Sequence, residues 1–268
     1  MEIGVSTASL FMRADTKDAL DILNAIDARV VEIFLESFSE YNAEYISSLK
    51  NRLGSLKVNS LHTVTTQFEP QLFSLVDIQK KDAYAFMREI CRGAKLIGAK
   101  NYTLHGRARV KKYAKLDDFD SYVPHFNELC DLLSEYDMEL CLENVEWCFY
   151  SYPEWFSKIK ERCPKLKTCL DVKQARISGY KAEDYIREMA GRINTVHLSD
   201  VDANGKMCLP GKGVTDFKAL FERLSDTGFC GNMLIEVYTG DYGAIDEIAD
   251  SLDYLRDIFT GVFKNEKV

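Results

Sequence analysis

Six short apolar segments of this chain each end in a histidine or an acidic residue. In chain order the pairs are Leu61-His62, Leu104-His105, Leu142-Glu143, Leu170-Asp171, Val196-His197 and Ile235-Glu236, and they use three of the four histidines. A single histidine at such a place is more often a hydrogen-bonded core residue than a ligand. Six ionisable groups gathered in one place would be costly to bury unless a cation or mutual hydrogen bonds compensated them. We therefore expect these side chains to meet around a metal ion.

Four of these residues form an oxygen-rich set of the kind that binds divalent metals. Three carboxylates and one imidazole belong to it, from Glu143, Asp171, Glu236 and His197. Such a set suits Mn²⁺ or Mg²⁺, and Zn²⁺ or Co²⁺ would also fit. We expect one divalent metal at these residues and favour Mn²⁺. His62 and His105 are either further ligands of a multinuclear site or hydrogen-bond partners of substrate hydroxyls.

Positioning these residues requires a series of strands, and the chain contains eight short apolar runs suited to the buried strands of a parallel sheet. They cover residues 3–7, 30–35, 57–62, 101–105, 139–143, 167–171, 193–198 and 233–238. Between them, apolar residues recur at spacings of three and four, as in Ala83, Met87, Ile90 and Ala94. This spacing is typical of a helix that packs one face on a sheet.

The alternation of strands and helices predicts the fold class α/β and a (β/α)8 TIM barrel, with residues 1–268 as a single domain. No linker interrupts the chain, whose 15 Gly and 5 Pro are spread thinly. An open doubly wound sheet would more often have fewer strands, and no G-x-G-x-x-G follows the first strand. Barrel enzymes place their active sites at the carboxyl ends of the strands, where the six polar residues fall.

Composition and charge exclude several classes of partner. The formal net charge of −8, from 42 acidic and 34 basic residues, repels nucleic acid and gives no general affinity for anionic lipid. The N-terminus lacks the features of a secretory signal, and no run of about 18 uncharged apolar residues could span a membrane. The eight cysteines include no C-x-x-C pair and are interpreted as reduced thiols. We therefore expect a cytoplasmic protein with neither nucleic acid nor a membrane as its partner.

Several short motifs, taken in order, resemble the xylose-isomerase-like barrel superfamily. They are Leu140-Cys141-Leu142-Glu143-Asn144, Cys169-Leu170-Asp171, Val196-His197-Leu198-Ser199-Asp200, Pro210-Gly211-Lys212-Gly213 and Leu234-Ile235-Glu236. The superfamily includes sugar phosphate isomerases and epimerases, ketose 3-epimerases, hydroxypyruvate isomerases, inosose dehydratases and the endonuclease IV type of apurinic-site nuclease (AP endonuclease family 2). The resemblance implies that Glu143, Asp171, His197 and Glu236 bind one metal. It also implies that His62 and His105 face substrate or, as in the nucleases, bind additional zinc.

Two departures from the family pattern bear on the chemistry. Many members carry a histidine three residues after the Asp that ends strand six, where this chain has Gln174. The trinuclear nucleases also have an Asp-x-His after strand seven, whereas residues 201–210 contain Asp202 but no histidine. We therefore do not expect a complete three-zinc centre, and we assign Gln174 to substrate binding.

These residues predict a divalent-metal-dependent isomerase or epimerase of a small sugar or sugar phosphate. The metal would polarise a carbonyl or hydroxyl so that a carboxylate can remove a neighbouring carbon-bound proton, through an enediolate. Glu143 and Glu236 would be the catalytic base and acid, unless both are only metal ligands. Two other functions stay open: endonuclease IV-like hydrolysis at abasic DNA sites, and a non-catalytic sugar-binding barrel.

The predicted substrate-binding residues lie just beyond the strand ends, and they are His62, His105, Arg107, Trp147, Gln174 and Lys212. Arg107 opens a basic run with Arg109, Lys111 and Lys112. Such a run suits phosphate oxygens but is equally typical of a solvated loop. Lys212 is either a second phosphate contact or simply exposed.

Aromatic residues after strand five have two interpretations. Trp147, Phe149 and Tyr150 could stack on the apolar face of a sugar, or they could pack the loop against the barrel. Residues 68–73 and 147–155 could cover the pocket or join the subunits of a homo-oligomer.

Overall fold

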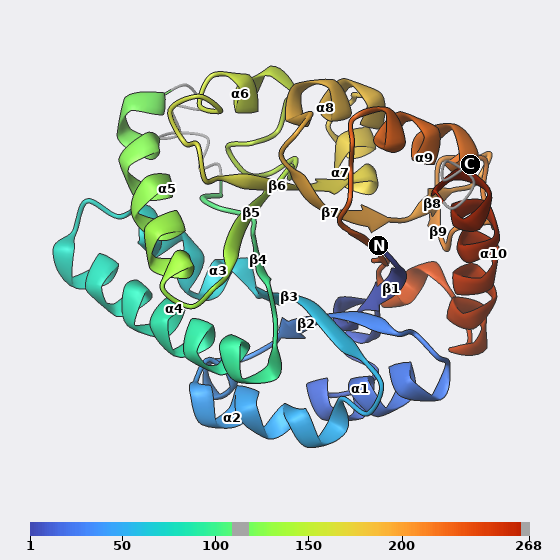
Figure 1. The fold of residues 1–268 in the computed structure, drawn as a ribbon, viewed down its shortest axis with the longest axis horizontal. Coiled ribbons are helices and arrows are strands. Elements are labelled where there is room, and N and C mark those ends of the chain that lie inside the picture. The colour runs from blue at the N-terminus through green and yellow to red at the C-terminus, as the bar shows by residue number, and fades with distance from the viewer. Residues whose placement is uncertain (109–117, 264–268) are drawn as a thin grey trace.

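The computed structural model describes residues 1–108 and 118–263, which form a closed barrel of eight parallel strands (Figure 1). The strands follow one another around the barrel in chain order. They are β1 (Ile3–Ser6), β2 (Val30–Leu35), β3 (Lys57–Thr63), β4 (Asn101–Leu104), β5 (Glu139–Glu143), β6 (Lys167–Asp171), β7 (Ile193–Leu198) and β10 (Asn232–Ile235). The predicted α/β class and (β/α)8 TIM barrel are confirmed.

Helices cover the outer face of the barrel (Figure 1). They are α1 (Thr16–Ala25), α2 (Ala43–Ser48), α4 (Asp77–Ile97), α5 (Phe119–Ser134), α6 (Glu154–Ser157), α8 (Ala182–Met189), α9 (Phe217–Asp226) and α10 (Asp246–Phe263). In the part of the chain that the structure describes, no helix is both long and apolar enough to cross a membrane.

The helix α4 shows how the sequence directs a helix onto the barrel. Its buried residues recur at spacings of three and four and include Ala83, Met87, Ile90 and Ala94. The helix ends at Gly98, whose φ of 81° lies in the left-handed region that glycine adopts without a side-chain clash. The helical periodicity predicted for this segment is therefore confirmed.

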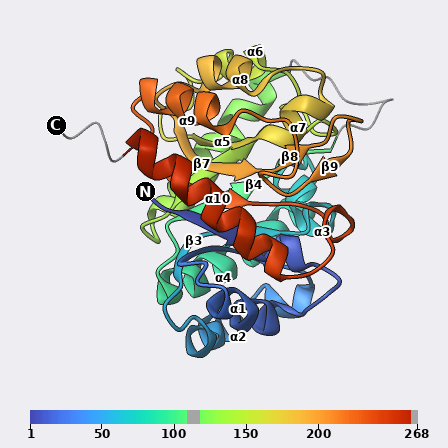
Figure 2. The same ribbon diagram turned by 90° about the vertical axis from the view of Figure 1, so that its right-hand side faces the viewer.

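Short elements follow several strands at one end of the barrel, which lies on the right in Figure 2. The helix α3 (Thr65–Phe68) follows β3, and α7 (Val172–Ile177) follows β6. A hairpin of β8 (Asp200–Val201) and β9 (Met207–Cys208) follows β7. Single 3-10 turns add η1 (Thr7–Leu10), η2 (Phe38–Glu40), η3 (Leu49–Arg52), η4 (Glu69–Phe73) and η5 (Thr239–Asp241). Most of these connections border the carboxyl ends of the strands.

Four strands, β2, β5, β6 and β7, have the predicted boundaries. The last strand of the barrel differs, because it ends at Ile235 rather than at residue 238. The Glu236 amide still donates to the Leu198 carbonyl at 3.0 Å, but the Val237 amide donates to Ser9 Oγ at 3.3 Å. The chain thus leaves the strand ladder after Glu236 and turns into η5.

Candidate metal centre

Asp171 is held at the mouth of the barrel by contacts to its backbone and to one carboxylate oxygen. Asn144 Nδ2 donates to the Asp171 carbonyl at 2.9 Å, and the Asp171 amide donates to Asn144 Oδ1 at 2.8 Å. Asp171 is also the N-cap of α7, where Oδ1 accepts a hydrogen bond from the Gln174 amide at 2.7 Å. These contacts leave Oδ2 available, 4.0 Å from His197 Nδ1.

Four side chains meet where β5, β6, β7 and β10 end, and we call Glu143, Asp171, His197 and Glu236 the acidic cluster. One potential ligand atom from each residue lies within 4.8 Å of the others. His197 Nδ1 is 3.2 Å from Glu236 Oε2 and 3.7 Å from Glu143 Oε1. The structure therefore brings together the four residues predicted as ligands, although they lie far apart in the sequence.

The acidic cluster contains buried polar atoms that have charged neighbours at contact distance but no hydrogen bond within the described residues. Within residues 1–108 and 118–263, the atoms without a hydrogen-bond partner include Glu143 Oε2, Asp171 Oδ2, His197 Nδ1 and Glu236 Oε2. Burying three carboxylates in this way is costly unless a cation compensates their charge. Carboxylate and imidazole donors suit divalent metals from Mn²⁺ to Zn²⁺. The residues thus fit the predicted cofactor, whose identity stays a prediction.

Two carboxylates of the acidic cluster differ in protonation. Burial raises the pKa of Glu236 to about 7, even though His197 and Lys173 act in the opposite direction. Burial also opposes the charge of Glu143, but His105 and His197 hold the pKa of Glu143 well below its usual range. At neutral pH Glu143 is therefore ionised, whereas Glu236 is near the midpoint of its titration. Two carboxyl groups with separated pKa values are suited to opposite roles in proton transfer.

The other ring nitrogen of His197, Nε2, contacts Glu32, a residue of β2 that the sequence analysis did not identify. Glu32 is fully buried inside the barrel, and its Oε1 lies 3.1 Å from His197 Nε2. Hydroxyl groups of three other strands donate to the same carboxylate, from Ser6 at 3.1 Å, Ser60 at 2.7 Å and Thr103 at 2.6 Å. A carboxylate behind a metal-binding histidine fixes the orientation of its ring. The sequence did carry one signal for Glu32, because it is the only charged residue in an otherwise apolar strand.

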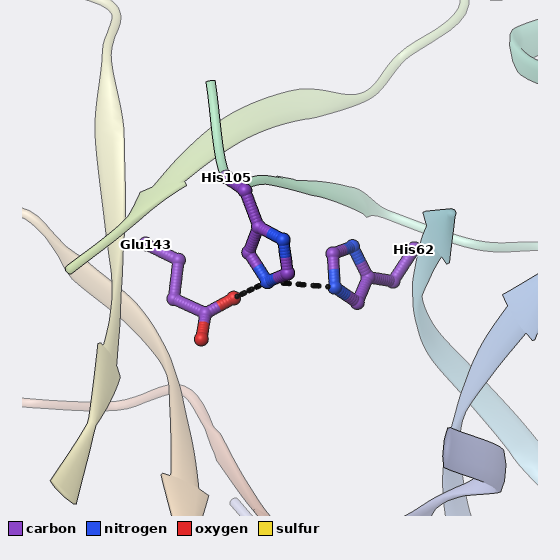
Figure 3. A group of neighbouring side chains, drawn as sticks. All are labelled: His62, His105 and Glu143. Carbon is purple, nitrogen blue, oxygen red and sulfur yellow. Dashed lines mark hydrogen bonds and ion pairs between the residues drawn. The ribbon is translucent and has the colours of Figure 1, made fainter. Parts of the chain in front are cut away.

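His62 and His105 lie beside Glu143, and we call them the histidine pair (Figure 3). Their Nε2 atoms are 3.1 Å apart, and His105 Nε2 lies 3.0 Å from Glu143 Oε2. On the outer side, His62 Nδ1 is 2.9 Å from the Thr103 carbonyl oxygen, and His105 Nδ1 contacts Thr65 Oγ1. The outer nitrogens of the pair thus have protein partners, while the inner nitrogens contact each other and His105 Nε2 also contacts Glu143.

The two histidines also differ in protonation. Burial, together with the charge of His105, lowers the pKa of His62 to about 4. Burial opposes the charge of His105 as well, but Glu143 and other carboxylates raise the pKa of His105 to about 8. The histidine pair and Glu143 also offer three potential ligand atoms within 4.8 Å of one another. Both predicted roles of the pair, metal ligand and substrate partner, stay predictions.

A cavity of about 260 Å³ opens beside the acidic cluster and the histidine pair. Four of the predicted substrate-binding residues line it, namely His62, His105, Trp147 and Gln174. Trp147 meets His105 edge to face, with ring centroids 5.4 Å apart. Further aromatic walls come from Phe11, Phe34 and Tyr238. The cavity therefore suits a small ligand held between aromatic walls and an ionisable floor.

Two predicted substrate-binding residues lie elsewhere. Arg107 and Lys212 are exposed and do not line this cavity. The rest of the predicted basic run, Arg109, Lys111 and Lys112, lies outside the described residues. The described residues therefore give the cavity no arginine clamp for a phosphate.

The aromatic residues after β5 divide between the two interpretations. Trp147 lines the cavity, whereas Phe149 and Tyr150 are buried and do not. Phe149 stacks on Tyr122 and Trp155 with ring centroids 4.9 and 5.0 Å apart. Packing against the barrel is therefore the role of Phe149 and Tyr150, because stacked neighbours already occupy the faces that a sugar would need.

Lys173 is a second residue that the sequence analysis did not identify. It lies in the first turn of α7, lines the cavity and is 3% exposed. Its Nζ is 3.9 Å from Asp171 Oδ2 and 4.1 Å from the centroid of the Tyr238 ring. Burial opposes its charge, but Asp171 and Glu236 raise the pKa of the ammonium group above its usual value. The sequence signal that could have identified Lys173 is its position two residues after Asp171, where a strand ends.

Solved structures share this fold at low sequence identity. The D-psicose 3-epimerase of Clostridium cellulolyticum H10, solved with D-tagatose, is 18% identical with a TM-score of 0.79, covering 96% of this chain and 99% of that one. A D-tagatose 3-epimerase-like protein is 16% identical with a TM-score of 0.79, covering 99% of each chain. The IolI protein with a bound zinc atom is 17% identical with a TM-score of 0.78, covering 98% of this chain and 99% of that one. At these identities the likeness shows the fold alone.

Sequence comparison gives the family. An uncharacterised protein of Methanocaldococcus jannaschii is 24% identical over 263 residues, which cover 96% of this chain and 99% of that protein. Residues 20–258 match the family described as the xylose isomerase-like TIM barrel, and this range includes the whole acidic cluster. The chain therefore belongs to the xylose isomerase-like TIM barrel family.

Proposed function

We propose that this protein is a divalent-metal-dependent isomerase or epimerase of a small sugar or sugar phosphate. The observation that carries the proposal is the acidic cluster, whose four buried ligand atoms lack hydrogen-bond partners in the described residues. The cavity beside it is lined by Glu143 and Glu236 of this cluster and by the basic groups of His62, His105 and Lys173. Proteins of the same fold include a D-psicose 3-epimerase and a D-tagatose 3-epimerase-like protein, which supports a sugar as the substrate.

The acidic cluster would hold one divalent metal. Its donor set favours Mn²⁺, and Zn²⁺, Co²⁺ or Mg²⁺ are also compatible. The zinc atom in the IolI structure supports a metal in this fold. When bound, the metal would supply Lewis-acid polarisation of a substrate carbonyl or hydroxyl. Glu32 behind His197, and Asn144 beside Asp171, hold two of the ligands in place through their contacts.

Glu143 and Glu236 are the proposed proton carriers. Glu143 is ionised at neutral pH, so it can accept a proton from a substrate carbon. Glu236, with a pKa of about 7, can hold a proton or donate one. His105, with a pKa of about 8, can place a positive charge beside the negative charge that develops on a substrate oxygen. His62, Trp147 and Gln174 would position the substrate in the cavity.

The test is solvent deuterium exchange with a defined metal. The protein is stripped of metal, reloaded with Mn²⁺ and incubated in D₂O with ketoses and aldoses, both phosphorylated and unphosphorylated. We expect one bound metal per chain, and deuterium at the carbon next to the carbonyl only in the reloaded sample. Metal binding without exchange of any sugar would favour the sugar-binding barrel. A protein that binds no divalent metal would refute the proposal.

Hydrolysis at abasic DNA sites is a second candidate function. It is favoured by the potential ligand group of His62, His105 and Glu143, which adjoins the acidic cluster. The net charge of −8 opposes the approach of DNA. Cleavage of an abasic duplex by the zinc-loaded protein, without deuterium exchange into any sugar, would select hydrolysis.

A further inference from the structure

Lys173 places a positive charge in the wall of the cavity without a hydrogen-bond partner. The side chain is 3% exposed, and no hydrogen bond joins its Nζ to any residue of 1–108 or 118–263. The contact with Asp171 Oδ2, at 3.9 Å, is too long for a hydrogen bond, and the other neighbour is the face of the Tyr238 ring. The ammonium nitrogen is not among the fully buried atoms without a partner in the described residues, and Lys173 lines the cavity. Its donors are therefore available to a ligand there.

The cavity offers one strongly basic side chain. Among the described residues that line it, Lys173 is the only lysine or arginine. Two other lining residues, Glu143 and Glu236, are carboxyl groups, which repel a doubly charged phosphate more than a singly charged carboxylate. Phosphate is usually bound by several donors or by an arginine fork. A carboxylate carries a single charge and matches one ammonium group. The lining therefore favours a carboxylate over a phosphate.

The charges of the acidic cluster lead to the same class of ligand. When all three carboxyl groups are ionised, they and a divalent metal together leave one negative charge, which the ammonium group of Lys173, 3.9 Å from Asp171 Oδ2, offsets. Lys173 therefore lowers the repulsion that an anionic substrate meets at the floor of the cavity. With it, an anionic end can lie against Lys173 while the carbonyl end lies against the acidic cluster. The ring of Tyr238 restrains the ammonium group from its other side through a cation–π contact.

We propose that the substrate of this site carries a carboxylate, which Lys173 binds. This inference rests on the proposed isomerase or epimerase function and narrows its substrate to hydroxycarbonyl acids, such as keto acids derived from sugars. Lys173 is then a specificity-determining residue, which selects a carboxylate-bearing substrate over a neutral ketose of the same length.

The experiment measures binding rather than turnover. Three probes share a four-carbon chain, and none has a carbonyl group that could enolise: erythritol is neutral, erythronate carries a carboxylate, and erythritol 4-phosphate carries a phosphate. Calorimetry on the Mn²⁺-loaded protein gives the dissociation constant of each. We expect erythronate to bind most tightly, and Lys173→Met to weaken erythronate at least about tenfold while changing erythritol by less than about threefold. Lys173→Arg should retain most of the preference.

A matched control is Lys167→Met. Lys167 begins the same strand at the opposite end of the barrel and pairs with Glu139 at 3.6 Å, so its loss should change no probe. A carboxylate can also contact the metal directly, and the comparison of variants separates that effect from the effect of Lys173. Thermal unfolding and Mn²⁺ titration of each variant show that fold and metal binding are intact.

Four results would overturn the inference. Equal weakening of erythronate and erythritol in Lys173→Met, or a loss confined to Mn²⁺ affinity, would show that Lys173 only balances the charge of the acidic cluster. Tighter, Lys173-dependent binding of erythritol 4-phosphate would assign a phosphate instead. If neutral ketoses exchange deuterium at the same rate in Lys173→Met as in the unchanged protein, the substrate need not carry a carboxylate. The proposed isomerase or epimerase function would still stand. If no compound exchanges while erythronate binding still depends on Lys173, the proposed function fails and the anion site stands.

Discussion

The acidic cluster and the histidine pair lie at the same mouth of the barrel and both involve Glu143, but they satisfy their polar atoms differently. In the acidic cluster, each of the four residues has a buried atom without a hydrogen-bond partner in the described chain. In the histidine pair, Thr103 and Thr65 occupy the outer nitrogens, and the inner nitrogens of the two rings contact each other. The protein alone completes the second group but not the first.

This difference indicates where a cation is needed. Excess carboxylate charge and unpaired lone pairs make the acidic cluster unfavourable without a metal, whereas the histidine pair can share a proton with Glu143. The proposed single metal at the acidic cluster, with the histidine pair facing the substrate, would account for both groups. Glu143 would then connect the metal side of the mouth to the substrate side.

The largest expected effect comes from Glu236→Gln, which removes a proton carrier from the acidic cluster. Deuterium exchange into substrate should fall about 10² to 10⁴-fold, because this is the usual contribution of a general acid or base. Exchange is measured in Mn²⁺-saturated samples so that weaker metal binding is not mistaken for lost proton transfer. Glu222→Gln, at an exposed ion pair with Lys218, is the control and should leave exchange unchanged. Full exchange in saturated Glu236→Gln would leave Glu236 as a ligand only.

The next effect concerns the support behind the acidic cluster. Glu32→Gln should weaken Mn²⁺ binding about 10 to 100-fold, because the carboxylate that orients His197 is lost. Titration of the stripped protein with Mn²⁺ measures this directly. Glu40→Gln is a matched control, since Glu40 is also buried but bonds to Thr16 and Tyr45 in the outer layer. Equal losses in the two variants would mean that Glu32 only stabilises the fold.

Metal affinity should also depend on pH through the carboxyl group of Glu236. Glu236 has a pKa raised to about 7, so below that pH it binds a proton that a metal must displace. The apparent Mn²⁺ affinity should therefore fall about tenfold more per unit of pH below 7 than above it. Titrations between pH 5.5 and 8.5 measure the slope, and Glu236→Gln should remove the break near 7. A break that persists in this variant would assign the proton to another group.

The smallest effect is expected on the other side of the mouth. His62→Asn should change Mn²⁺ affinity by no more than about threefold, because His62 is not needed to compensate the acidic cluster. Substrate binding should weaken instead, since His62 lines the cavity. If the unchanged protein binds two metal ions per chain and His62→Asn binds one, the proposed difference between the acidic cluster and the histidine pair is wrong. That result would show that the histidine pair holds a second cation.

The fold and much of the candidate site were accessible from sequence because both depend on local pattern. Continuous apolar runs and helices with a 3.6-residue period specify the barrel, and polar residues that end successive strands must share its carboxyl face. Glu143, Asp171 and His197 each end or nearly end a strand in the structure, as their positions in the chain indicated. The pattern could not predict whether Arg107 and Lys212 reach the cavity, because it does not fix the direction of side chains on connecting loops.

The sequence by itself determined the alternation of strands and helices, and with it the gathering of the acidic cluster at one mouth. Only the tertiary structure decided that Glu32 lies behind His197 and that Lys173 lies inside the cavity. Both are lone charged residues whose meaning depends on which neighbours surround them, and those neighbours come from other strands. Local pattern marked both positions, as a lone charge in an apolar strand and a lysine just after a strand end, but it did not give their neighbours, because burial and contacts are properties of the assembled barrel.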